Sequence, residues 1–476
     1  MSFRSITIEP ILARWPSLLQ IDPVGSLLGK TREFWQQLTR RELNLPTDRR
    51  IIATGHQPTL WHPGILAKYA AVDAALRERG PRLASGVNIV VDQDVLAPAA
   101  FDVPLRRSDG TLASRQIDLG PPRRVDEVPV GFMPAFQPRE IQVDSLGELP
   151  ELAGSVQHIR AALAAEAHQS SAAAQVAAAL SRLMQQCADL APLSAITGSD
   201  LMRTTLARAL LQAMADDPHR CAKAYNRAVA AHPRAHLSPL AIRDDYVELP
   251  LWRVRDDRTR VRAYDADLQS SRPAVIDHES SITLLPRALF MTAFIRLAVA
   301  DLFVHGAGGA IYDRAMEQWI REWLGAEVSS MATATATVRL PLMRDGDLDL
   351  IARSGLAAAR RRARLLEHDP EAADGEAGGW GVHHPGPRKQ RLLREIDALP
   401  PRSHERRQSY FEMHRRLEAM RREHSATIEG ARVDLVRLQR LARDAEIALR
   451  RDWAFPLYPR QMLLDLTSSV RAAVGA

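Results

Sequence analysis

Residues 50–94 alternate between short β-branched runs and one long helical pattern, and this alternation constrains the fold more than any other feature of the chain. Arg50–Thr54 is a short apolar run, which is typical of a strand. Pro63-Gly64 precedes residues 65–76, whose apolar side chains recur on one helical face, and proline suits the first turn of a helix. Val87–Val91 is a second apolar run. A strand, a helix and a strand in this order predict a βαβ unit and therefore an α/β fold with a doubly wound parallel sheet.

The remaining chain divides by composition, and 476 residues are too many for one compact core. We expect a parallel-sheet core over residues 1–345, a helical arm over 346–452 and a C-terminal segment, 453–476, that returns to the core. Further elements are expected inside the core: a mostly helical lead-in over 1–48, loops and an edge hairpin over 97–145, a helical insertion over about 150–240, paired strands over 246–254 and 261–264, a helix over 284–297, a buried strand over 298–304 and a helix over 311–324.

The C-terminal third differs in kind, because residues 350–366 and 388–452 are dense in charge and in helix-forming residues. A glycine-rich stretch, 374–381, separates them, and Pro400-Pro401 interrupts the second. Side chains step by three and four along two stripes: Tyr410, Met413, Leu417, Met420 and His424 in the first, and Leu435, Leu438, Ala442, Ala445 and Leu449 in the second. Heptad spacing predicts an antiparallel helical hairpin or coiled coil. We expect the first stripe to cover the second, within the hairpin or across subunits, and the arm to form a homodimer.

Composition disfavours several classes of protein. No run of about eighteen uncharged apolar residues occurs, so the sequence predicts no membrane span. Cys187 and Cys221 have no metal-type spacing, which predicts reduced thiols in a cytoplasmic protein and no metal site formed by cysteines. The net charge is +6, yet arginines alternate with acids, as in Arg415-Arg416-Leu417-Glu418. This pattern is typical of a solvated helical face and disfavours nucleic acid as the main partner.

The loop between the first predicted strand and its helix is the first candidate site. It contains Gly55-His56-Gln57, His62 and Gly64. Backbone amides at a helix N-terminus bind phosphate, and two histidines beside such a site could stabilise charge on a phosphoryl group. In the alternative interpretation, His56 caps the backbone of a structural turn and His62 packs beside Trp61.

Two further loops follow predicted strands. Asp92-Gln93-Asp94 ends the second strand, where carboxylates commonly hold a ribose hydroxyl, an amine or Mg²⁺; alternatively, one of them caps the next element. His305-Gly306-Ala307-Gly308-Gly309 ends the strand expected over 298–304, and its glycines would let a ligand approach the backbone closely. A tight turn is the alternative there, and Asp301 is a candidate partner for His305.

The sequence contains no GxxxxGK[ST], HExxH or CxxC motif. Their absence disfavours P-loop nucleotide hydrolysis, zinc metalloprotease chemistry and cysteine-pair redox or metal sites.

With these residues in view, the chain resembles the cysteine ligase, or cysteine-adding enzyme, of bacillithiol biosynthesis. Residues 54–64 look like the family's Thr-Gly-Gln-Gln-x-x-Leu-Phe-x-Gly-Pro loop, and Lys68 lies near the position of the family's lysine. Val91–Asp94 is similar to its Glu-Asp-His-Asp motif, and residues 304–312, which end in Tyr312, are similar to its Gly-Gly-Pro-x-Glu-Ile-x-Tyr loop. The arginine-rich arm followed by Phe455–Pro459 resembles its coiled coil and closing segment. These four anchors occur in the family's order across nearly the whole chain.

The resemblance implies a Rossmann-like core, a coiled-coil arm that dimerises, and a small-molecule enzyme, which is either a ligase that forms a carbon–nitrogen bond or a nucleotidylyl-type transferase. The family joins cysteine to an amino sugar–malate conjugate, so a cysteine-like amino acid and an amino-sugar-type or other amine acceptor are expected, with ATP or another nucleotide as cofactor. Three departures suggest a different acceptor: Gln93 replaces the family's histidine, Gly309 replaces its glutamate, and His62 and His305 are additions.

These expectations give two hypotheses for the site. In the first, His56, His62, Asp92 and Asp94 are catalytic, while Gly55, Gln57, Gly64, Lys68, His305, Gly306, Gly308, Gly309 and Tyr312 bind the cofactor. In the second, the chain is a non-catalytic assembly protein that binds a nucleotide or metabolite in a vestigial pocket and dimerises through the arm.

Overall fold

The structure, a computed structural model, describes residues 3–22, 25–80, 82–121, 127–141, 150–269, 283–352, 355–373 and 386–473. The chain forms two compact units. Unit 1 comprises residues 1–105, 114–340 and 451–476, and unit 2 comprises residues 106–113 and 341–450. The glycine-rich stretch 374–381 falls outside the described residues.

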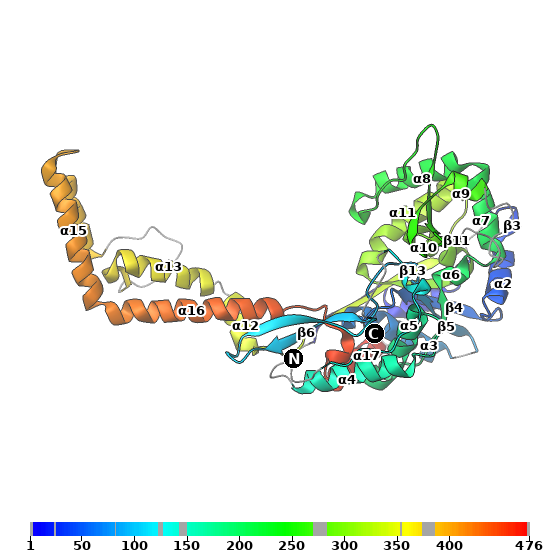
Figure 1. The fold of residues 1–476 in the computed structure, drawn as a ribbon, viewed down its shortest axis with the longest axis horizontal. Helices are drawn as coiled ribbons and strands as arrows, with labels where there is room; N and C mark the ends of the chain where they lie inside the picture. The colour runs from blue at the N-terminus through cyan, green and yellow to red at the C-terminus, as the bar shows by residue number, and fades with distance from the viewer. Residues whose placement is uncertain are drawn as a thin grey trace. The chain divides into compact units, whose positions relative to one another are not determined.

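Unit 1 is built on a six-stranded sheet in the order β1-β13-β12-β4-β5-β8 (Figure 1). Its strands are β1 (Phe3–Glu9), β4 (Arg50–His56), β5 (Ala84–Val90), β8 (Ser194–Thr197), β12 (Leu302–His305) and β13 (Ser330–Val338). Neighbouring strands run parallel except at one edge, where β1 is antiparallel to β13. The fold is therefore mixed α/β with a mostly parallel central sheet, and β4 and β5 are the pair that residues 50–94 predicted.

The helices of unit 1 include those that pack on both faces of this sheet. They are α1 (Trp15–Leu18), α2 (Arg32–Glu42), α3 (Pro63–Arg79), α4 (Pro150–Ala165), α5 (Ala172–Ala188), α6 (Gly198–Leu201), α7 (Thr205–Asp216), α8 (Pro218–Ala231), α9 (Asp265–Gln269), α10 (Ala288–Ala298), α11 (Ala307–Leu324) and α17 (Arg460–Ala472). Ile51 and Ala53 of β4 lie in a large core cluster with residues of α2, α7, α8, α10 and α11. Because successive strand residues point to opposite faces, the buried Ile52 points the other way, and α3 packs on the sheet together with α17.

Several strands depart from the sequence-based expectation, among them Thr283–Pro286, which occupies the start of the helix expected over 284–297. The lead-in 1–48 begins with β1 rather than a helix, the insertion 150–240 returns to the sheet through β8, and β13 was not foreseen. The Ala-Thr alternation of β13 buries Ala332, Ala334 and Ala336, and side chains this small give a weak hydrophobic signal. They also allow α3 to approach closely: a Cβ on Gly64 would lie 2.7 Å from the Ala336 carbonyl oxygen.

Smaller sheets complete unit 1. The paired strands expected over 246–254 and 261–264 are β9 (Glu248–Val254) and β10 (Arg260–Tyr264), and β11 (Thr283–Pro286) pairs with the other edge of β9. The expected hairpin is β6 (Ala100–Arg106) with β7 (Leu112–Asp118), and β2 (Ser26–Leu27) pairs with β3 (Lys30–Thr31). After unit 2 the chain contacts the sheet again, because the Tyr458 hydroxyl donates to the Val338 carbonyl at 3.2 Å.

Unit 2 is helical over most of its described length. Its helices are α12 (Asp345–Ala352), α13 (Gly355–His368), α14 (Pro387–Asp397), α15 (His404–Glu423) and α16 (Ser425–Ala448). One cluster joins α14 to α15 through Leu392, Ile396, Met413, Leu417 and Met420, and another joins α13 to α16 through Ala363, Leu366, Ile428 and Ala431. No described helix in either unit is both long enough and apolar enough to cross a membrane.

These two clusters correct the expected packing of the stripes. Met413, Leu417 and Met420 pack against α14 and do not cover the 435–449 stripe. The reason is side-chain size, because Leu392 and Ile396 offer more apolar surface than Ala442 and Ala445.

Candidate functional site

The site lies where the sheet changes its direction of winding. From β4 the chain crosses through α3 to β5 on one side, and from β12 it crosses through α11 to β13 on the other, while β4 and β12 are direct parallel neighbours. In open α/β sheets such a switch leaves a crevice at the carboxyl ends of the two central strands. Gly55-His56 and His305-Gly306 stand at those ends.

The N-terminus of α3 is already satisfied by protein groups. The Gly64 amide donates to His62 Nδ1 at 3.0 Å, and the amides of Ile65 and Leu66 donate to the His62 carbonyl at 3.0 and 3.3 Å. His62 is thus the cap of this helix, and burial lowers its pKa, which keeps Nδ1 available as an acceptor. This corrects the expectation that these amides hold a phosphate.

His56 is neutral at physiological pH. Burial, assisted by the nearby Lys68 charge, lowers its pKa to about 3. Its ring meets Trp61 edge-on with centroids 5.9 Å apart, and Trp61 stacks on Tyr69 at 4.7 Å. The neutral imidazole can exchange hydrogen bonds with a ligand, so any stabilisation of phosphoryl charge by His56 would come from hydrogen bonding.

The positive charge near these loops belongs to Lys68 of α3. Its Nζ donates to the Gly55 carbonyl at 2.7 Å, and the residue is only 3% exposed. Over the described residues no carboxylate lies within ion-pair distance of this ammonium, and burial lowers its pKa to about 7. The Lys68 side chain also passes Gly306, since its Cδ lies 3.9 Å from where a Cβ on Gly306 would be. Lys68 therefore touches both loops of the switch.

Asp92 and Asp94 have different surroundings. Asp92 is buried, accepts from the Ser199 amide at 3.0 Å at the start of α6, and has its pKa raised by burial to about 6. This is the capping role of the alternative interpretation. Asp94 is one-third exposed and accepts from the Gln57 side-chain amide and from Arg260, each at 3.1 Å.

Arg260 brings in a group that the sequence analysis missed. Its guanidinium lies 4.4 Å from the centre of the Trp252 ring, and Arg287 lies 4.9 Å from the same ring. Arg287 is held by the buried Glu248 at 2.7 Å. One arginine among so many gives no signal in the sequence, and Arg260 meets Asp94 across 166 residues.

The helix with an uncapped N-terminus at this site is α11, whereas the N-terminus of α3 is capped. Gly306 is the N-cap of this 18-residue helix and supplies no side-chain acceptor. No described group is seen to cap the amides of Ala307, Gly308 and Gly309, and space around Gly308 is open to 4 Å. Uncapped amides and the helix dipole favour an anion at this end.

His305 points into the first turn of α11. Its Nε2 lies 3.2 Å from Asp313 Oδ2, and Arg296 holds the same carboxylate oxygen at 2.7 Å. Asp301, the candidate partner from the sequence, precedes β12 and ion-pairs with Arg40 at 2.8 Å, so it cannot reach the other end of the strand. Tyr312 meets the His305 ring edge-on at 5.5 Å, and burial raises its pKa, so its hydroxyl remains protonated.

Gly309 and His305 form one steric unit. A Cβ on Gly309 would lie 2.2 Å from His305 Nδ1, which no real contact permits. The glycine at 309 and the histidine at 305, both departures from the family pattern, therefore depend on each other.

We expect Gly309→Ala to destabilise unit 1 by about 1–3 kcal/mol, because the added methyl overpacks the turn against His305. The double variant His305→Ala with Gly309→Ala should recover most of this loss. Urea unfolding of the four members of the cycle measures the coupling, and additive effects would contradict the steric link.

His56 and Gly306 each lie near Lys68 at the switch. Gln57, Asp94 and Arg260 are joined by hydrogen bonds. His305, Gly309 and Tyr312 pack together. His62, Gly64 and Asp92 serve helix ends and packing instead, and Gly55 lets β4 lie close to Ile89. No group of three or more metal-ligating side chains occurs within the described ranges. Comparison with models of known protein families and with curated proteins finds no match to this chain.

Proposed function

We propose that the chain is a small-molecule ligase or transferase that acts on a nucleotide or phosphorylated intermediate at the switch between β4 and β12. The observation that carries this proposal is Lys68, a buried lysine without a carboxylate partner among the described residues, placed between the two loops. A buried ammonium is costly unless an anion completes its surroundings. The uncapped start of α11 beside it favours the same kind of ligand.

In this proposal a phosphate group lies at the N-terminus of α11 and Lys68 stabilises the charge that develops on it. The one-third exposed Asp94 accepts a hydrogen bond and then a proton from an amine acceptor, whose nitrogen attacks an activated carboxyl carbon. The bond between that carbon and the oxygen of the phosphate-bearing group breaks, and this group leaves. The new bond is a carbon–nitrogen bond, which agrees with the resemblance to the bacillithiol cysteine ligase. The same resemblance supports a Rossmann-like core and, together with two buried free thiols, a cytoplasmic location.

The second candidate function is a non-catalytic assembly protein with a vestigial pocket. The structural roles of His62 and Asp92 favour it, because two of the four residues expected to be catalytic hold helix ends instead.

Nucleotide-dependent thermal unfolding can refute the ligase or transferase proposal, whereas a vestigial pocket allows a nucleotide to bind without requiring it. A ligand at one hundred times its dissociation constant adds about 2.7 kcal/mol to stability. The ligase or transferase proposal expects such a gain with ATP or another nucleotide, whereas no gain with any nucleotide or aminoacyl analogue favours the assembly protein.

We also propose that unit 2 dimerises as a coiled coil. The most exposed large apolar side chains of its long helices are Val433 and Val436 on α16 and Phe411 on α15, which are 58%, 63% and 73% exposed. Leu435, by contrast, packs toward α13 within the chain.

Val433→Asp with Val436→Asp is therefore expected to convert a dimer into a monomer without unfolding the helices, because both side chains lie outside the core of unit 2. Light scattering at micromolar concentration measures the mass. A monomer mass for the unmutated chain would defeat the proposal.

A further inference from the structure

A polar cavity lies at the opposite end of β4 from the candidate site. It encloses about 530 Å³ and is lined by the start of α2, the entrance to β4 and residues before β5. β4 spans Arg50–His56, so at about 3.3 Å per residue this cavity is roughly 20 Å from the crevice at the carboxyl ends. Nothing in the proposed function uses it.

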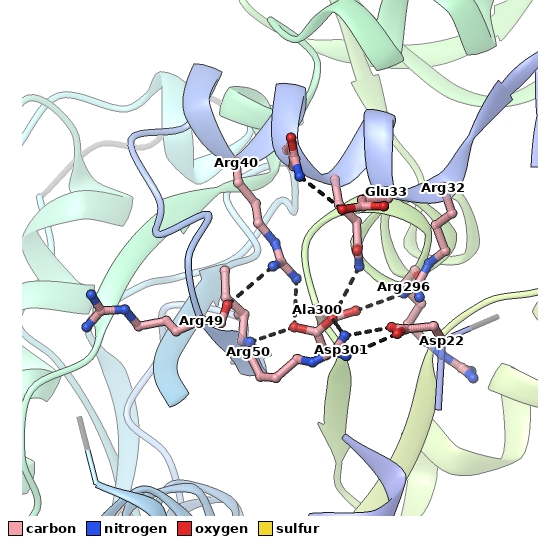
Figure 2. Close-up of polar contacts among 12 residues, drawn as sticks. Asp22, Arg32, Glu33, Arg40, Arg49, Arg50, Arg296, Ala300 and Asp301 are labelled. Atoms are coloured by element: carbon pink, nitrogen blue, oxygen red, sulfur yellow. Dashed lines mark hydrogen bonds and ion pairs between the residues drawn. The ribbon is translucent and has the colours of Figure 1, made fainter. Parts of the chain in front are cut away.

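Three guanidinium groups lie at its base, and two of them, those of Arg40 and Arg50, pair with the two carboxylates there (Figure 2). Asp301, which is 2% exposed, accepts from Arg40 at 2.8 Å and from Arg50 at 3.2 Å. Arg50 also pairs with Asp22 at 2.6 Å. The inner group of Arg32, Arg40, Arg50, Asp22 and Asp301 therefore carries one unbalanced positive charge.

That charge resides on Arg32. The residue is 7% exposed, and its guanidinium donates only to carbonyls at the end of α10, those of Arg296, Leu297 and Ala300, at 3.2–3.3 Å. Among the described residues no carboxylate lies within 4 Å of it. Capping a helix C-terminus explains why an arginine stands here, but it leaves a formal charge uncompensated in a buried place.

The rim of the cavity reinforces this charge. Arg49 and Arg82 also line it, against Asp48 and Glu33. Counting the lining alone, five arginines face three carboxylates. The cavity volume is in the range of small-molecule sites.

From this arrangement we propose that the cavity binds the phosphate group of a small molecule, with Arg32 at its base and Arg82 at its rim. A phosphate supplies the missing negative charge and accepts several guanidinium hydrogen bonds at once. The site is separate from the Lys68 crevice, so it adds a second anion site to the chain.

Calorimetric titration at constant ionic strength tests this inference, with inorganic phosphate, pyrophosphate and ATP as probes. Saturable binding of phosphate is expected, and tighter binding of pyrophosphate or ATP by the Lys68→Met variant, which lacks the crevice site, would identify a larger phosphorylated molecule as the natural source. Two variants of exposed rim residues should act in opposite directions: Arg82→Ala should weaken binding and Glu33→Gln should strengthen it, each by about three- to fivefold.

Lys68→Met is the control, because it alters the distant crevice and should leave phosphate binding at this cavity unchanged. Absence of saturable binding for all three probes would overturn the inference. So would binding that Lys68→Met abolishes while Arg82→Ala and Glu33→Gln leave it unaltered, since the anion would then belong to the crevice.

Discussion

Lys68→Met is expected to stabilise unit 1 while removing its nucleotide binding. Burial lowers the lysine pKa from 10.5 to about 7, a shift that corresponds to roughly 5 kcal/mol. Methionine has a similar length and no charge, but it leaves the Gly55 carbonyl without its donor, which costs about 1–3 kcal/mol. A net gain of about 2–4 kcal/mol in the free energy of unfolding at pH 7 should remain.

The pH dependence has a definite sign. The folded pKa of Lys68 lies below its unfolded value, so between about pH 7 and 10.5 the unfolded chain binds more protons and stability rises with pH. The wild type should approach the stability of Lys68→Met as the pH increases through this window. Urea unfolding at several pH values measures the difference, with the exposed Lys223→Met as the matched control. If the difference in stability between the wild type and Lys68→Met did not change with pH, the pKa of Lys68 would be the same in the folded and unfolded chains, which would contradict the prediction.

Asp301→Asn is expected to destabilise unit 1 by about 3–5 kcal/mol, the cost of breaking a buried ion pair on one side only. The carboxylate accepts from Arg40, Arg50, Gln36 and the Ile51 amide, and the variant leaves two buried or half-buried guanidiniums without their shared charge.

Asp48→Asn is the control for this variant, because Asp48 also pairs with an arginine but its side chain is 67% exposed. Its effect should stay within about 1 kcal/mol. Equal losses for the two variants in urea unfolding would refute the claim that Asp301 organises the entrance to β4 and β12.

The sequence was most informative where periodicity was strong. The β-branched runs at 50–54 and 87–91 and the helical face between them led directly to β4, α3 and β5. The sequence did not predict β13 because its buried residues are alanines, which give a weak hydrophobic pattern. It did not predict β1 because an antiparallel edge strand is not part of a βαβ unit. In unit 2 the heptad stripes correctly indicated helices, but the choice of partner depended on Leu392 and Ile396, which lie outside both stripes.

The candidate site was less predictable, because its chemistry depends on burial and on distant contacts. Residue types at strand ends located the loops, but only the three-dimensional surroundings distinguish Asp94 from the helix-capping Asp92, or neutral His56 from the ammonium of Lys68. Arg260 and Trp252 come from a separate small sheet and reach Asp94 only through folding.

The central claim is that Lys68 is a buried lysine poised to bind a ligand, and NMR titration of lysine side chains tests it most directly. The chain contains four lysines, Lys30, Lys68, Lys223 and Lys389, so isotope labelling at the side-chain carbon next to the amine gives a spectrum of four resonances. One resonance should titrate near pH 7, disappear in Lys68→Met and shift when ATP or another nucleotide binds. The account would be contradicted if all four resonances titrated near pH 10.5 and none of them shifted on addition of a nucleotide.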